Sequence, residues 1–138
     1  MNNGLKNFIY KGYKFGIVGI LSTIFNYSIF AFLFKIISVH YIFSSVSGYL
    51  FGLILGYLLN KNWTFGAEVD KSKSYIVSYV FVYFISLISS QLLLFTLVET
   101  FIINPLYANI FAIVLSTLMN FFGTNFFVFR ITEKTYAR

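Results

Sequence analysis

Basic and amide side chains gather where the hydrophobic segments of this 138-residue chain begin or end. Lysine, arginine and asparagine suit a phosphate group, because the charge-assisted hydrogen bonds that they donate to its oxygens are strong. Interfacial anchoring in a membrane explains single lysines and arginines equally well. It does not explain asparagines that continue rows of small residues on helix faces, so we favour phosphate or headgroup binding. The candidates are Lys61, Lys14, Arg130, Asn60 and Asn120.

A second group of polar residues lies inside the hydrophobic segments, where buried polar groups need partners and often mark a pathway. Asn26 and Gln91 lie near the middle of their segments, and Ser90 aligns with Asn26 at an offset of 64 residues. These three residues are candidates for a path that receives a hydrophilic group. The alternative is hydrogen bonding between helices, worth about 0.6 kcal/mol per contact. We favour this alternative for serines, which can bond to their own helix, and leave both interpretations open for Asn26 and Gln91.

Two charged residues, Lys35 and Glu99, occupy equivalent positions 64 residues apart, at the ends of the first and third hydrophobic segments. They are candidates for an outer gate, although an exposed pair contributes little energy. His40 follows in the same loop as Lys35 and fits an interfacial residue better than a ligand. The chain has one histidine and no cysteine, and no segment has a charge at its centre. We therefore expect no catalytic residues, no metal site and no cofactor.

The composition decides the class of protein that must position these residues. The chain is 59% hydrophobic and only 10% charged, too apolar for a soluble domain of this size. A membrane span needs about 20 mostly apolar residues, and four segments qualify: 13–36, 42–59, 75–98 and 106–129. The sequence therefore predicts an all-α integral membrane fold with four transmembrane helices.

Two of these segments carry the same stripe of small and polar residues at four-residue spacing. Such a stripe lies on one helix face and lets a second backbone approach closely. Matched aromatic end-pieces follow, Trp63-Thr64-Phe65 and Phe127-Val128-Phe129. We predict a single domain at 1–138, with a repeat at 12–65, a linker at 66–74, a repeat at 75–129 and a tail at 130–138. The stripes are Ser44, Gly48, Gly52, Gly56, Asn60 and Ala108, Ala112, Ser116, Asn120, Thr124.

The basic residues predict the orientation in the membrane. Of the ten lysines and arginines, only Lys35 lies outside the N-terminal segment, the central loop and the tail. Positive residues flank spans on the cytoplasmic side, so both termini and the central loop are expected there. A pair of spans returns to its starting side, and the two repeats are therefore parallel. The net charge of +6 is explained by topology and lipid headgroups, not by nucleic acid.

Short motifs in three places resemble the GtrA family of small four-span bacterial membrane proteins. They are Phe15-Gly16-Ile17-Val18-Gly19 with Thr23, then Asn60-Lys61-Asn62-Trp63-Thr64-Phe65, and Asn120-Phe121 leading to Val128-Phe129. The resemblance covers nearly the whole chain. It implies a multi-pass protein of the bacterial cytoplasmic membrane that moves a polyprenyl-phosphate-linked sugar to the outer leaflet, for surface-polysaccharide or teichoic-acid glycosylation. Where the second repeat of the family often has a basic residue matching Lys61, this chain has Asn125.

The residues and the resemblance combine into one hypothesis of flipping. Lys61, Lys14 and Arg130 would bind the phosphate, Asn60 and Asn120 the headgroup, and Asn26, Gln91 and Ser90 the passing sugar. A non-transporting scaffold for a polyprenyl-phosphate glycosyltransferase is the alternative. A coupled exporter is disfavoured because no carboxylate lies inside the spans, and an enzyme is disfavoured most. Four helices enclose little volume, so we expect a homo-oligomer, with a dimer as the simplest case.

Overall fold

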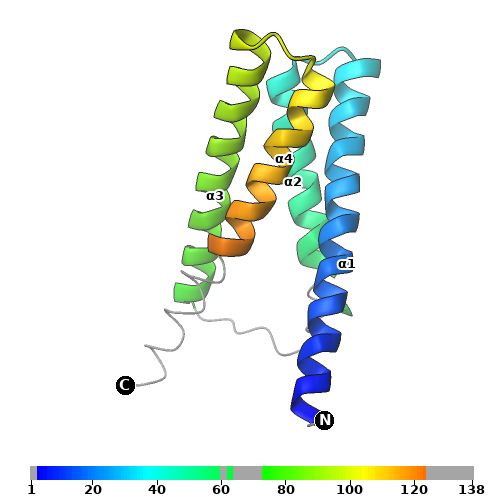
Figure 1. Ribbon diagram of the computed structural model, residues 1–138, viewed down its shortest axis with the longest axis vertical. Helices are drawn as coiled ribbons and strands as arrows, with labels where there is room; N and C mark the ends of the chain where they lie inside the picture. Colours follow the sequence, from blue (N-terminus) through cyan, green and yellow to red (C-terminus); the bar gives the residue numbers. More distant parts are fainter. Residues whose placement is uncertain (1–2, 60–61, 64–72, 124–138) are drawn as a thin grey trace. The chain divides into compact units, whose positions relative to one another are not determined.

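The structure is a computed structural model that describes residues 3–59, 62–63 and 73–123 (Figure 1). The described residues form helices joined by short turns, with no strand among them. Two of the helices end in a short π-helical turn. The elements in chain order are α1 (Asn3–Ala31), η1 (Phe32–Ile36), α2 (Tyr41–Leu59), α3 (Lys73–Phe95), η4 (Thr96–Thr100) and α4 (Pro105–Gly123).

Four segments are long and apolar enough to cross a membrane, which confirms the predicted all-α fold with four spans. Their apolar windows are only 17% to 28% buried inside the protein, so most of the apolar surface is left to face lipid. The chain is therefore a multi-pass membrane protein. The helix α1 begins well before the predicted start of its span, and the predicted end of the fourth span at residue 129 lies outside the described residues. The segments are Gly16–Ile36, Tyr41–Leu59, Tyr79–Thr100 and Pro105–Gly123.

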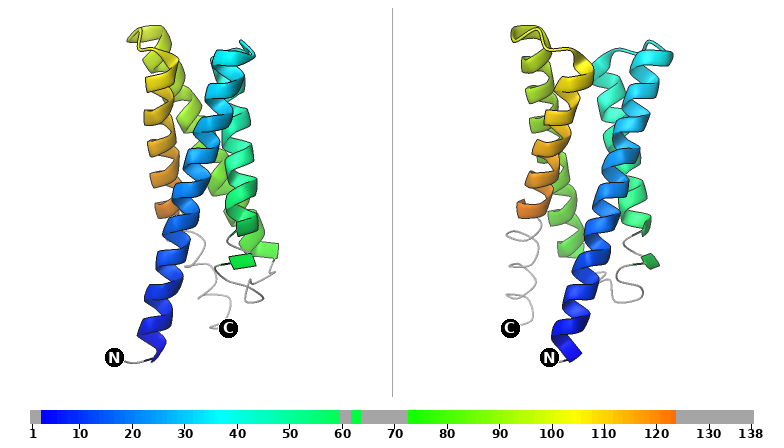
Figure 2. Two further views of the ribbon diagram at one scale, coloured as in Figure 1. Left: turned by 90° about the vertical axis from the view of Figure 1, so that its right-hand side faces the viewer. Right: turned by 45° about the vertical axis from the view of Figure 1, so that its right-hand side comes forward.

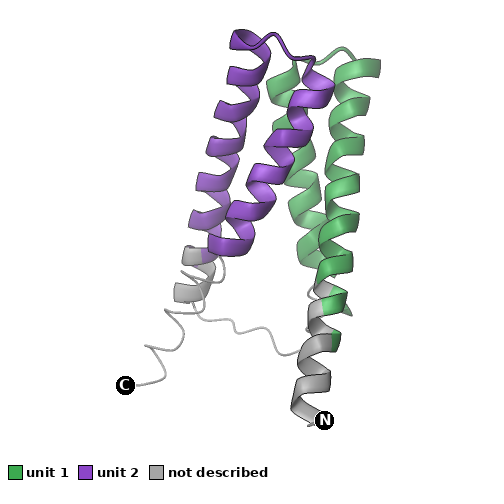
Figure 3. Cartoon of the chain, in the orientation of Figure 1, with its two compact units in different colours: residues 1–69 green, residues 70–138 purple. Residues whose placement is uncertain are grey.

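The chain divides into two compact units, Met1–Val69 and Asp70–Arg138 (Figure 3). Each contains one pair of helices that run side by side and are joined at one end by a short turn (Figure 2). We call α1–η1–α2 the first hairpin and α3–η4–α4 the second hairpin. In each, the turn end is the end with the connecting turn, and the open end is the opposite one. The parallel relation of the repeats, their boundaries and the cytoplasmic location of the termini stay predictions.

The two turn ends are built alike, and their main backbone features recur 64 residues later. The Ile37 N–H donates to the Phe32 carbonyl at 3.2 Å, and the Phe101 N–H donates to the Thr96 carbonyl at 3.3 Å. The chain then reverses through one left-handed residue, Ser38 with a φ of 62° or Ile102 with a φ of 55°. A left-handed residue after a helix is a common way to end it, because it lets the following N–H groups reach the last carbonyls.

A side chain caps the second helix of each hairpin at the same position. The His40 Nδ1 accepts the Ile42 N–H at 3.3 Å, and the Asn104 Oδ1 accepts the Leu106 N–H at 2.9 Å. Both bonds satisfy an N–H that the first turn of a helix leaves without a partner. His40, expected to be an interfacial residue, therefore has a local structural role, and its ring also stacks on Tyr41.

Glycines bring α1 and α2 into backbone contact in the first hairpin. A methyl group added at Gly48 would lie 2.5 Å from the Asn26 main-chain oxygen and 2.7 Å from its Oδ1. One added at Gly52 would lie 2.9 Å from the Asn26 Cβ, and one at Gly56 would lie 2.9 Å from the Ser22 Oγ. No side chain therefore fits between α2 at these positions and the facing atoms of α1. The close-packing function predicted for this stripe is confirmed.

The second hairpin is held by side chains and a hydrogen bond. Ala108, Ala112 and Ser116 are all buried on α4. The Ser86 hydroxyl of α3 donates to the Ser116 carbonyl of α4 at 3.0 Å. The equivalent stripes therefore serve the same packing role with different chemistry, since the second hairpin has Ala and Ser where the first has Gly.

The close contact between α1 and α2 can be tested with glycine-to-alanine variants of the full chain. Gly48→Ala forces a methyl group against two oxygens of Asn26, and we expect it to lower the free energy of unfolding by about 1–3 kcal/mol, as overpacking does. Gly19→Ala is the matched control on α1, because nothing lies within 4 Å of its new methyl group. Reversible unfolding in mixed micelles measures both. Equal stabilities would contradict the backbone contact at Gly48.

A second test concerns the turn end of the second hairpin. Ile102 is a β-branched residue in a left-handed conformation, an arrangement that costs an L-residue about 1–2 kcal/mol. Its side chain is 87% exposed, so little packing is lost when it is removed. Ile102→Gly should therefore raise the Tm, and Ser38→Gly should raise it less because serine is not β-branched. An unchanged or lower Tm for Ile102→Gly in a thermal melt would contradict the left-handed turn.

Candidate functional site

Lys14 brings the open end of the first hairpin together. Its ammonium group donates to the Trp63 main-chain oxygen at 3.3 Å. It also lies 4.6 Å from the centroid of the Tyr10 ring and 5.3 Å from that of the Trp63 ring, within the range of cation–π attraction. Tyr10 and Lys14 are one helical turn apart on α1, whereas Trp63 comes from beyond α2.

The setting of Lys14 leaves it able to bind an anion. A lysine ammonium has three N–H donors, and the Trp63 oxygen accepts one of them. Within the described ranges, no acidic side chain pairs with Lys14. Two aromatic rings hold the cation without neutralising its charge, so a phosphate oxygen can still gain a charge-assisted hydrogen bond from it.

The other candidates for phosphate or headgroup binding lie partly beyond the described residues. Asn60, Lys61 and Arg130 fall outside them, as do Thr64, Phe65 and residues 127–129 of the aromatic end-pieces. Asn120 lies half-buried in the last turn of α4, in the second hairpin. Of the five predicted residues, the structure therefore shows the surroundings of Lys14 in detail.

Asn26 lies in the contact between α1 and α2. It is 8% exposed, and its Oδ1 is buried without a hydrogen-bond partner in the described part of the chain. The Ser22 Oγ, one helical turn away, is also buried and without a partner there. Both oxygens face glycines of α2: Asn26 faces Gly48, and Ser22 faces Gly56. A bare oxygen in an apolar medium is costly, because no water replaces the missing donor.

The candidate path residues of the second hairpin are in different settings. Ser90 is 2% exposed, and its hydroxyl donates to the Leu87 carbonyl of its own helix at 2.8 Å. This is the local bonding that we favoured for serines. Gln91 is half-buried on the same helix, with its Oε1 shielded from solvent. Sequence reasoning missed Asn109, which is fully buried on α4, because it lies beside the stripe and not on it.

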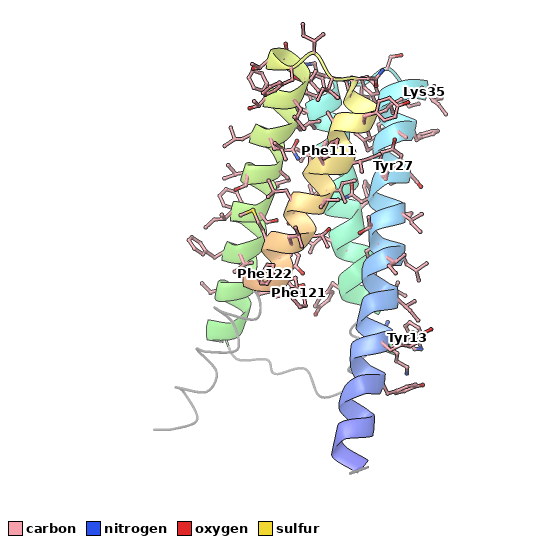
Figure 4. All side chains as sticks on the ribbon, viewed as in Figure 1. Tyr13, Tyr27, Lys35, Phe111, Phe121 and Phe122 are labelled. Carbon is pink, nitrogen blue, oxygen red and sulfur yellow. The ribbon has the colours of Figure 1, made fainter. Side chains whose placement is uncertain are left out.

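The candidate gate residues occupy matching places in their own hairpins. Lys35 is exposed in η1, and Glu99 is exposed in η4. Figure 4 shows Lys35 at the turn end of the first hairpin and Tyr13 toward its open end. A pairing between Lys35 and Glu99 stays a prediction. Across the described residues, no group of His, Asp and Glu side chains is arranged to hold a metal ion.

Comparison with known proteins assigns the chain to a family. The profile of the family described as "GtrA/DPMS, transmembrane domain" matches residues 14–129, from Lys14 through all four spans. The resemblance seen in the sequence motifs is thereby confirmed. No curated protein and no solved structure matches the chain.

The contact between Lys14 and Trp63 can be tested by fluorescence, because Trp63 is the single tryptophan of the chain. Lys14→Ala removes the bond to the Trp63 oxygen and the cation over its ring, so acrylamide should quench Trp63 more strongly than in the unmodified protein. Lys6→Ala removes the same charge from the same helix two turns away and should leave quenching unchanged. Equal quenching in both variants would contradict the contact.

Proposed function

Because the chain belongs to the family of GtrA/DPMS transmembrane domains, we propose that it flips a polyprenyl-phosphate-linked monosaccharide across the bacterial cytoplasmic membrane. The product would serve glycosylation of a surface polysaccharide or teichoic acid. The family match over all four spans carries the proposal, since it points to a membrane function that involves glycosyl lipids. The protein acts on this lipid without catalysis and without a cofactor.

The charge distribution supports this substrate. A polyprenyl-phosphate sugar has one phosphodiester charge between an apolar tail and a hydroxyl-rich headgroup. Lys14 supplies a cation at the open end of the first hairpin, held by Trp63 and with no acidic partner among the described residues. Inside the spans, away from Lys35 and Glu99 at the turn ends, the polar groups are uncharged, as Asn26 and Ser90 illustrate. Cations at the end and neutral polar groups inside match the two parts of such a headgroup.

The proposed path begins at the basic residues and continues at the polar residues of the spans. Lys14, Lys61 and Arg130 bind the phosphate, and Asn60 and Asn120 bind the adjoining headgroup. Asn26, Gln91 and Ser90 receive the sugar hydroxyls, while the polyprenyl tail stays in lipid because it gains nothing by leaving. Lys35 and Glu99 control release at the turn ends. The active species is a homo-oligomer, with a dimer as the simplest arrangement, because four helices enclose little volume.

The proposal is tested by leaflet-specific transfer of polyprenyl-phosphate glucose in vesicles that contain only this protein. Lys14→Ala and Lys61→Ala should each lower the transfer rate about tenfold or more, the effect of losing a hydrogen bond to a charged group. Arg130→Ala should do the same. Lys6→Ala, which removes a positive charge outside the cluster, should leave the rate unchanged.

Two results would contradict parts of the proposal. If Lys61→Ala and Arg130→Ala both transfer at the unmodified rate, the phosphate assignment is wrong. If the unmodified protein does not accelerate transfer of polyprenyl-phosphate glucose but co-purifies with a polyprenyl-phosphate glycosyltransferase, it is the scaffold and not the flippase.

A further inference from the structure

The two hairpins differ at their equivalent polar positions. Ser86 and Ser90 of α3 donate hydrogen bonds to main-chain oxygens of the second hairpin. At the positions 64 residues earlier, Ser22 and Asn26 of α1 have buried oxygens without a partner in the part of the chain that the structure describes. On this helix face, the two polar side chains have hydrogen-bond partners in the second hairpin, whereas in the first hairpin their oxygens have none among the described residues.

The unsatisfied oxygens are aimed at a surface that has no side chains. Asn26 is more than nine-tenths buried, and its Oδ1 lies 2.7 Å from where a Gly48 methyl group would be. Gly52 and Gly56 continue that surface past Asn26 and Ser22. Because glycines form this cover, no side chain at positions 48, 52 or 56 has to move when α2 moves away from α1. A donor that enters between the helices would then satisfy both oxygens at once.

The chemistry of this face selects the donor. An amide oxygen accepts hydrogen bonds, and a serine hydroxyl both accepts and donates. No Asp, Glu, Lys or Arg lies between residues 15 and 34 or between 41 and 59. A charged group there would be desolvated without a counter-ion, whereas a neutral hydroxyl needs only a hydrogen-bond partner. The face therefore suits an uncharged polyol and disfavours a uronic acid or a free amino sugar.

We propose that Ser22 and Asn26 form a binding seam for an uncharged sugar, which opens when α1 and α2 separate along Gly48, Gly52 and Gly56. At the equivalent positions of the second hairpin, Ser86 and Ser90 bond to main-chain oxygens, so that helix face forms no such seam. The proposal rests on the proposed function for the identity of the ligand, the sugar of a polyprenyl-phosphate glycolipid. It adds that equivalent helix faces of the duplicated halves have different roles.

The first experiment replaces Asn26 with serine, the residue at the equivalent position 90 of the second hairpin. Asn26→Ser, in the full chain, should reduce transfer of polyprenyl-phosphate glucose at least fivefold, about the effect of one ordinary hydrogen bond. Its Tm should be no lower than that of the unmodified protein, because an unsatisfied oxygen is removed. The matched control is Ser86→Ala, which breaks the bond to Ser116. It should lower the Tm and leave transfer per folded molecule unchanged.

A second experiment closes the seam reversibly. The Ser22 Cβ and a Cβ built at Gly56 are 3.6 Å apart, within the range that disulfides adopt. The chain has no cysteine, so Ser22→Cys with Gly56→Cys introduces one defined pair. Oxidation should reduce transfer to the level of empty vesicles, and reduction of the same sample should restore the rate that this double variant had before oxidation. Equal transfer in the oxidised and reduced states would overturn the opening of α1 from α2.

A binding measurement separates this inference from the proposed function. Short-chain isoprenyl-phosphate glucose should raise the Tm of the unmodified protein more than isoprenyl phosphate alone, since a ligand stabilises the state that it binds. Asn26→Ser should lose that extra rise. If this holds while no transfer occurs, flipping is wrong and the sugar seam stands. If Asn26→Ser keeps the extra rise, or lowers the Tm with transfer intact, Asn26 is structural and the seam is wrong.

Discussion

Helices in a membrane cannot be joined by the hydrophobic effect, because lipid tails are as apolar as the side chains that they touch. What remains is close van der Waals contact and hydrogen bonding, and the first hairpin depends on the former. Gly48 allows the backbone of α2 to meet both oxygens of Asn26. A side chain at that position would clash with both oxygens and hold the helices apart there.

The same constraint explains why polar chemistry is divided between the ends and the middle of the protein. A charge needs water, a counter-ion or a polarisable neighbour, and Lys14 has the rings of Tyr10 and Trp63 together with a main-chain oxygen. In the middle of the spans, serines bond to main-chain oxygens, as Ser86 and Ser90 do. The Asn26 Oδ1 has no such partner among the described residues, and at this position the first hairpin differs from the second.

The sequence predicts those parts of the structure that follow from periodicity and polarity. Four-residue spacing of small residues was sufficient to place Gly48, Gly52 and Gly56 in a helix contact. Asn104 was predictable as a cap, because asparagine before an apolar run is a usual helix start, but histidine is not a usual cap and His40 was missed. The left-handed Ile102 runs against the preference of its residue type. The unsatisfied oxygen of Asn26 depends on what faces it from another helix, which local pattern does not encode.

The position of the connecting turn has a mechanical consequence for the first hairpin. The helices α1 and α2 are connected through η1 and Ser38, so a separation of the two helices is a rotation about this turn. At 1.5 Å per residue, Asn26 lies about 15 Å from the pivot and Lys14 about 33 Å from it. A rotation that moves Asn26 by a given distance moves Lys14 about twice as far. The separation is therefore largest at the open end, where a headgroup would enter, and smallest near the turn, where Lys35 would control its release.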